Sequence, residues 1–151
     1  MSVKPIPAGY HTITAQLSID GAAKAIDFYK AAFGAEVLDK AIDPSGNKVW
    51  HASLRIGDSN IMVNDVFPEM GGSQSQSSMW LYVPDADASF KRAVDAGAKA
   101  TMPPADMFWG DRMGQVADPF GQKWTIATHI KDLTPEEMKA AEKAFVASMK
   151  K

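Results

Sequence analysis

The chain has 151 residues, of which 46% are apolar and 23% charged, so a folded globular protein is expected and disorder is excluded as its main state. Sixteen Lys and Arg against 18 Asp and Glu give a net charge of −2, without the basic excess of nucleic-acid-binding domains. The absence of cysteine excludes disulfides, thiolate nucleophiles and Cys-ligated metals. The sequence contains no apolar run of about 18 residues and no signal peptide, so we expect a cytoplasmic protein without membrane contact.

The first half of the chain alternates like a strand, then like a helix, then like strands again. Residues 12–19 alternate apolar and polar side chains, and a helix capped by Asp20 is expected to end at Gly34. Strands are expected over residues 35–42, 48–56 and 60–64. In the second of these, Trp50 shares the core-facing parity, and His51 points to the opposite face. Residues 10–66 are therefore predicted to form one βαβββ module.

The second half repeats this order after a polar segment. Residues 67–77, rich in Ser, Gln and Gly, are predicted to be a flexible linker. Over 78–130 we expect a strand, a helix capped by Asp85, a strand ended by Pro103 and Pro104, and two strands joined by a type I turn at residues 118–121. Residues 1–9 form an N-terminal extension. Residues 131–151 contain a helix that begins at a capping box of Thr134 and Glu137.

Matching residues recur 64 positions apart in the two halves. Leu17 corresponds to Leu81, and Gly57 corresponds to Gly121. Several such pairs in the same order indicate an internal duplication. The predicted fold is α+β, with two tandem βαβββ modules that form a cupped mixed sheet and a C-terminal helix.

This duplicated plan resembles the vicinal oxygen chelate superfamily, which includes glyoxalase I, extradiol dioxygenases, fosfomycin-resistance enzymes and bleomycin-binding proteins. The segments that carry the resemblance are residues 20–23, 33–35, 109–112 and 118–121, with sequences Asp-Gly-Ala-Ala, Phe-Gly-Ala, Trp-Gly-Asp-Arg and Asp-Pro-Phe-Gly. The last two are similar to its PhnB-like branch. The resemblance implies a homodimer whose ligand-binding cups are completed across modules or chains.

The resemblance also implies four strand positions for metal ligands, and these fall on Thr14, Met62, Ser78 and Thr125. None of them is His, Glu, Gln, Asp or Cys. Hydroxyl and thioether groups are weak ligands for divalent transition metals, so we expect neither a metal nor another cofactor in the cup. Isomerisation and ring-cleaving oxygenation both use that metal as a Lewis acid, and neither activity is therefore assigned.

Other side chains are expected to line the cup beside these four positions. His51 is the best candidate for a general base, or else it is bonded to a strand neighbour. Aromatic rings can stack on a planar ligand or fill a core. Arg112 either grips an anionic ligand or pairs with Asp111. The full expected set of additional lining residues is Gln16, His51, Asn64, Trp80, Tyr82, Phe108, Trp109, Arg112 and Gln115.

The favoured interpretation is a metal-independent protein that binds a small molecule, such as an antibiotic or an aromatic metabolite. The alternative is a metal-dependent lyase, isomerase or dioxygenase whose metal site is relocated to His51 with His11 or His129. A third interpretation is a scaffold for a partner, in which side chains fill the cup.

Overall fold

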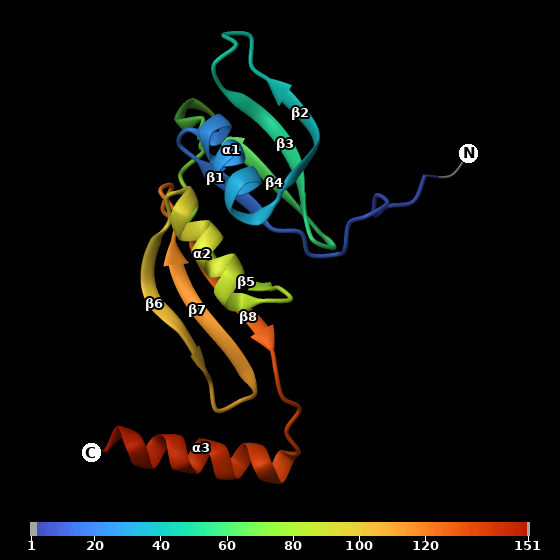
Figure 1. Cartoon of the computed structure of the whole chain (residues 1–151). Helices are drawn as coiled ribbons and strands as arrows, with labels where there is room; N and C mark the ends of the chain where they lie inside the picture. Colours follow the sequence, from blue (N-terminus) through green and yellow to red (C-terminus); the bar gives the residue numbers. More distant parts are fainter. Residues whose placement is uncertain (1–2, 151) are drawn as a thin grey trace.

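The computed structural model describes residues 3–150 and has the predicted α+β architecture (Figure 1). The first module consists of β1 (Gln16–Ile19), α1 (Ala22–Phe33), β2 (Glu36–Ile42), β3 (Val49–Ile56) and β4 (Ser59–Asp65). After a single 3-10 turn, η1 (Pro68–Met70), the second module consists of β5 (Ser78–Tyr82), α2 (Ala86–Ala96), β6 (Lys99–Asp106), β7 (Asp111–Ala117) and β8 (Lys123–His129). Helix α3 (Pro135–Met149) follows.

The hydrogen-bond register confirms the duplication residue by residue. The strand orders are β1-β4-β3-β2 and β5-β8-β7-β6, and the first pair in each sheet is parallel. Gln16 lies beside Met62 in the first sheet, and Trp80 lies beside Thr125 at the equivalent place in the second. Within this chain the two sheets are separate, one above the other in Figure 1.

The two modules are joined through their helices. Helix α1 covers one sheet, α2 covers the other, and the two helices contact each other. Tyr29 and Phe33 of α1 pack against Trp124 of β8, with ring centroids 5.4 Å and 4.5 Å apart. Arg92 of α2 donates from Nε to the Ala31 carbonyl at 2.8 Å, near the end of α1. The helix-covered faces thus share one core, and the opposite face of each sheet, its outer face, remains uncovered by α1 and α2.

A buried carboxylate lies at the centre of this joint. Asp118 Oδ2 accepts hydrogen bonds from the Tyr29 hydroxyl at 2.6 Å and from Trp124 Nε1 at 3.0 Å. Its Oδ1 accepts from the backbone N–H groups of Phe120 and Gln122 in the β7–β8 turn. Burial raises the pKa of Tyr29 far above its ordinary value, and the bond to Asp118 raises it further. The hydroxyl therefore stays neutral and ties α1 to the other module.

The helix starts differ from expectation at one place. Asp20 does not cap α1; instead the buried Asp65 at the end of β4 accepts from the backbone N–H groups of residues 21 and 22. A carboxylate at a helix N-terminus satisfies free donors and complements the helix dipole, wherever it lies in the sequence. Asp85 caps α2 as predicted. The predicted capping box of Thr134 and Glu137 is confirmed at α3.

Two strand predictions are also corrected. Strand β6 continues through Pro103 and Pro104 because it lies at the edge of its sheet, where a missing N–H donor on the free side is tolerated. Trp50 is 41% exposed and is not in the core. The register places Val49 opposite Ile42 and His51 opposite Ala41, so Trp50 is the extra residue of a bulge. Its ring stacks on Phe67, with centroids 4.4 Å apart.

The segment between the modules is bonded to both of them. Gln74 Oε1 accepts from the backbone of Asp20, and Gln74 Nε2 donates to the Phe120 carbonyl. The backbone N–H of Ser75 donates to the Ser18 carbonyl of β1. The segment therefore holds the end of β1 near the β7–β8 turn.

Helix α3 lies away from the rest of the chain in Figure 1. None of its residues Pro135–Met149 is buried, and its Phe145 stacks on Phe108, with centroids 5.0 Å apart. Among residues 3–150, every helix falls short of the length and apolar character that spanning a bilayer requires.

Replacing Tyr29 with Phe tests the joint between the modules. The variant leaves the Asp118 carboxylate buried with one donor fewer, so the free energy of unfolding should fall by about 1–3 kcal/mol. Urea unfolding followed by Trp fluorescence measures the change. The half-buried Tyr10→Phe is the matched control, expected within about 0.5 kcal/mol of the wild type. A Tyr29→Phe variant as stable as the control would contradict the proposed tie.

Candidate functional site

The outer face of the first sheet carries mostly polar side chains, with the charged Asp39 and Arg55 beside its centre. We call its central part the polar face, and it comprises Gln16, Ser18, His51, Ser53, Met62 and Asn64. Gln16 Nε2 donates to Asn64 Oδ1 at 2.9 Å, and Asn64 Nδ2 donates to Ser18 Oγ at 3.1 Å. The structure therefore brings together Gln16, His51, Met62 and Asn64, as the strand parity predicts.

His51 is half-buried on this face. Its Nε2 lies 3.1 Å from Ser53 Oγ and 3.5 Å from Asp39 Oδ1. Both neighbours approach the same ring nitrogen, so this is not the relay of a catalytic triad, in which the acid binds the opposite nitrogen from the nucleophile. Among the described residues no hydrogen-bond partner approaches Nδ1 of His51, and the catalytic role of His51 stays a prediction.

The outer face of the second sheet is aromatic instead. Trp80 and Tyr82 of β5 have ring centroids 6.0 Å apart, and Trp80 and Trp109 have centroids 6.4 Å apart. We call these three residues the aromatic platform. Trp80 is 46% exposed and Tyr82 is 62% exposed, so ring area remains open to contact. Such rings bind flat molecules by stacking and by burial of apolar area.

Three further predicted residues lie on the platform's face. Gln115 pairs with Thr125 in the register, and its Nε2 lies 3.4 Å from Thr125 Oγ1. Thr125 is buried beside Trp80, its neighbour on β5. Ser78 begins β5 and lies beside Lys123. The platform therefore has a small polar edge formed by Gln115 and Thr125.

A buried carboxylate organises the aromatic platform. Asp111 is 2% exposed, and its Oδ2 accepts from Trp109 Nε1 at 2.9 Å and from the Tyr82 hydroxyl at 3.1 Å. Its Oδ1 lies 2.8 Å from Nδ1 of His129. Burial raises the pKa of Asp111, but the hydrogen bonds from His129, Trp109 and Tyr82 together outweigh it and hold the pKa below its ordinary value. Asp111 is therefore ionised and fixes both rings.

His129 bridges this carboxylate and the segment that leads to α3. Its Nε2 lies 2.7 Å from Oδ1 of Asp132, which is almost fully exposed. The bonds from Asp132 and from Asp111 raise the pKa of His129 above its ordinary value. The two carboxylates thus favour the protonated, positively charged form of His129 at the corner of the platform.

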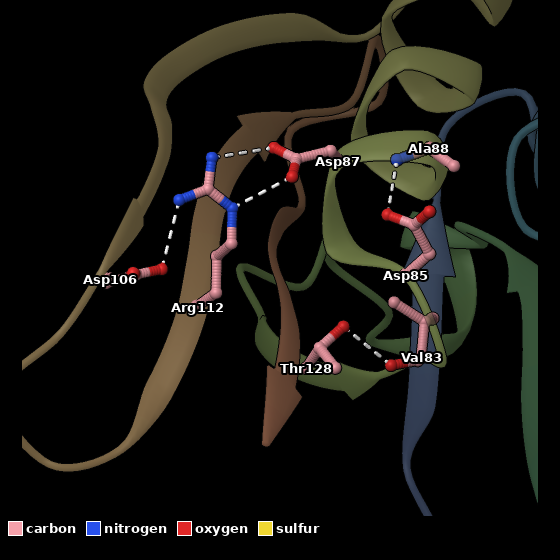
Figure 2. A network of polar contacts seen from close by, with 7 residues as sticks. All are labelled: Val83, Asp85, Asp87, Ala88, Asp106, Arg112 and Thr128. Carbon is pink, nitrogen blue, oxygen red and sulfur yellow. Dashed lines mark hydrogen bonds and ion pairs between the residues drawn. The ribbon is translucent and has the colours of Figure 1, made fainter. Parts of the chain in front are cut away.

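Arg112 does not lie on the outer face, contrary to prediction. Adjacent strand residues point to opposite faces, and Gly114, two residues on, meets Phe90 of α2. Figure 2 shows the Arg112 guanidinium between Asp87 of α2 and Asp106 of β6, at 2.8–3.0 Å. Its partners are these two carboxylates and not Asp111.

Phe108 lies beside the aromatic platform without joining its open surface. Its ring meets Trp109 edge-on, with centroids 5.1 Å apart, and stacks on Phe145 of α3 on another side. It therefore connects α3 to the corner of the platform that holds Trp109.

The four positions implied as metal-ligand sites are divided between the two sheets. Met62 lies beside Gln16 on the first sheet, and Thr14 precedes that strand, with its hydroxyl bonded to the His11 carbonyl. Ser78 and Thr125 lie on the second sheet. Two hydroxyls on one sheet, and one hydroxyl with a thioether on the other, do not fit a divalent transition metal. Among the described residues, no group of three His, Asp or Glu side chains is placed to hold a metal ion.

A cleft of about 810 Å³ runs between the modules along the free edge of β5. The chain before β1, including His11 and Thr14, and the β3–β4 turn line one side. Trp80, Tyr82 and Arg92 line the other. The aromatic platform therefore borders a hollow large enough for a small molecule.

The Asp111–His129 pair is the part of this site that sequence reasoning missed. From the sequence alone, Asp111 is a possible partner of Arg112, and His129 is a possible ligand of a relocated metal. A four-residue turn at 118–121 predicts Thr128 opposite Asp111, because residues equally distant from a hairpin turn lie opposite each other. The observed loop closes between Asp118 and Gln122, one residue longer, and this shift places His129 opposite Asp111.

The chain is similar in sequence and in fold to known proteins. The family model described as "Glyoxalase/Bleomycin resistance protein/Dioxygenase superfamily" matches residues 11–126. An uncharacterized protein of Mycobacterium bovis is 40% identical over 138 residues, which cover 85% of this chain and 90% of the relative. The anthracycline biosynthesis protein DnrV of Streptomyces peucetius is 30% identical over 111 residues, covering 74% of this chain and 38% of DnrV. The crystal structure of TioX from Micromonospora sp. ML1 matches with a TM-score of 0.65 and 25% identity, covering 82% of this chain and 100% of TioX.

Replacing His129 with Gln tests the charge of this corner. Because the folded-state pKa is raised above the ordinary value of about 6.5, the imidazolium stabilises the fold below that pH, and this stabilisation is lost as pH rises through the folded pKa. The wild type should therefore exceed His129→Gln in free energy of unfolding by more at pH 5.5 than at pH 8.5. Urea denaturation at both pH values measures the difference; a pH-independent gap would contradict the bridge.

Proposed function

We propose that this chain, which belongs to the Glyoxalase/Bleomycin resistance protein/Dioxygenase superfamily, binds a planar aromatic small molecule without a catalytic metal. The aromatic platform is the binding surface. Neither of the two separate pairs, Thr14 with Met62 or Ser78 with Thr125, offers the strong donors that the superfamily's Lewis-acid chemistry needs, and this supports binding.

One observation carries this proposal above all others. The large rings of Trp80 and Tyr82 are 46% and 62% exposed, although their neighbours on β8, Thr125 and Ala127, are buried. Asp111 Oδ2 accepts hydrogen bonds from Tyr82 and Trp109 and so fixes these two rings, and the Trp80 ring lies next to both. Rings fixed before a ligand arrives lose little conformational entropy on binding, so their burial contributes to affinity.

The relatives suggest a chemical class for the ligand. DnrV is described as an anthracycline biosynthesis protein, and anthracyclines are planar polycyclic molecules. A flat ring system of that kind matches the open surface of Trp80. We take an anthracycline as the first probe of the platform, since this chain has a similar sequence and a stacking surface.

We further propose that the protein works as a homodimer. Within one chain the polar face and the aromatic platform belong to separate sheets. A second copy that brings its polar face opposite the platform would supply amide groups of Gln16 and Asn64 to the edges of a stacked ligand.

Sedimentation equilibrium tests the homodimer. A mass of twice the chain is expected at micromolar concentration, because the exposed rings of the aromatic platform would be covered in the pair. A monomer mass in the presence of bound probe would contradict the assembly.

The platform itself is tested by replacing Trp80 with Ala. Burial of one such ring contributes about 1.5–3 kcal/mol to the binding free energy, so its loss should weaken anthracycline binding about tenfold or more. Titration followed by the probe's own fluorescence measures the dissociation constant. Trp50→Ala removes a ring of similar exposure from the other sheet and should leave the constant unchanged. Equal losses in both variants, or no binding by the wild type, would count against the platform.

A further inference from the structure

The outward nitrogen of His129 is held by a group that is easily displaced. Nδ1 is fixed by the buried Asp111, whereas Nε2 meets Asp132, whose side chain is 99% exposed. Asp132 lies in the irregular segment between β8 and α3. An exposed ion pair on such a segment contributes little stability, so another carboxylate competes with it at small cost.

His129 lies at the same corner as the aromatic platform. Asp111 accepts from Tyr82, Trp109 and His129 on one carboxylate, so these three side chains lie around a single group. Strand parity agrees, since Ala127, two residues before His129 on β8, lies beside Tyr82. A molecule stacked on Tyr82 therefore lies close to the imidazole ring of His129.

We infer that this corner recognises a planar aromatic carboxylic acid, with the ring on the aromatic platform and the carboxylate on Nε2–H of His129 in place of Asp132. This inference rests on the proposed function and names the class of ligand for that site. In the unbound chain Asp132 acts as a tethered competitor that mimics the ligand's carboxylate.

Once Asp132 is displaced, the imidazolium of His129 favours an acid over an amide or an amine. The titratable groups that face His129 are Asp111 from β7, Asp132 from the following segment and, through Asp111, Tyr82 from β5. Asp111 is already satisfied by three donors, so it offers little to a cationic ligand. The raised pKa of His129 keeps the imidazolium present near pH 6, where an aromatic acid is ionised.

The experiment compares 2-naphthoate with 2-naphthamide, which share a ring system and differ in charge. Their dissociation constants are measured at pH 6 by quenching of Trp fluorescence, for the wild type and for Asp132→Asn. Removal of the competing carboxylate should tighten naphthoate binding about fivefold, as for one exposed ion pair, and leave naphthamide binding unchanged. Asp95→Asn on α2 removes the same charge away from His129 and is the matched control.

A second variant, His129→Gln, replaces the imidazolium at the corner with a neutral side chain. It should bind both probes equally, because the charge that selects the acid is gone. If Asp132→Asn binds naphthoate no more tightly than Asp95→Asn does, the inference is overturned. If, in that case, all variants still bind both probes, the proposed function stands. If neither probe binds any variant, both the inference and the proposed function fall.

Discussion

The arrangement of this protein depends on one buried carboxylate. Asp118 lies in the turn between β7 and β8, yet it accepts the hydroxyl of Tyr29 from the other module and the indole N–H of Trp124 from its own. A buried carboxylate without donors is strongly unfavourable, so these groups have to meet. The hydrogen bonds of Asp118 to Tyr29 and Trp124 join the helix-covered faces of the two sheets. Both outer faces are consequently free for other contacts.

The duplication gives one scaffold with two different surfaces. Equivalent places carry Gln16 and Trp80 on the first strand of each module, and Ser18 and Tyr82 two residues later. In the first module each of these side chains is hydrogen-bonded to Asn64. In the second they are neighbouring rings, of which Tyr82 is hydrogen-bonded to Asp111. The same backbone register therefore supports hydrogen bonding on one face and stacking on the other.

Most of the fold follows from local patterns in the sequence, and the exceptions share a physical cause. Alternation, turn residues and the repeat give the element order, and strand parity places His51, Trp80 and Gln115 correctly. The sequence does not reveal that β6 lies at a sheet edge, where prolines are tolerated, and the continuation of this strand through two prolines was therefore not predicted. Nor does parity survive a bulge, which turns Trp50 out of the core. Of the site, the platform was predictable, but Arg112 was placed on the wrong face and the Asp111–His129 bridge required the register of a hairpin.

The account's central claim is that ligands bind on the aromatic platform, and the four tryptophans of the chain allow a direct measurement. Each indole N–H gives one resonance in a proton–nitrogen correlation spectrum, and two of them belong to the platform. On titration with an anthracycline, the resonances of Trp80 and Trp109 should move, while those of Trp50 and the buried Trp124 stay in place. Movement of the Trp50 resonance with Trp80 unchanged would place the ligand elsewhere and contradict the account.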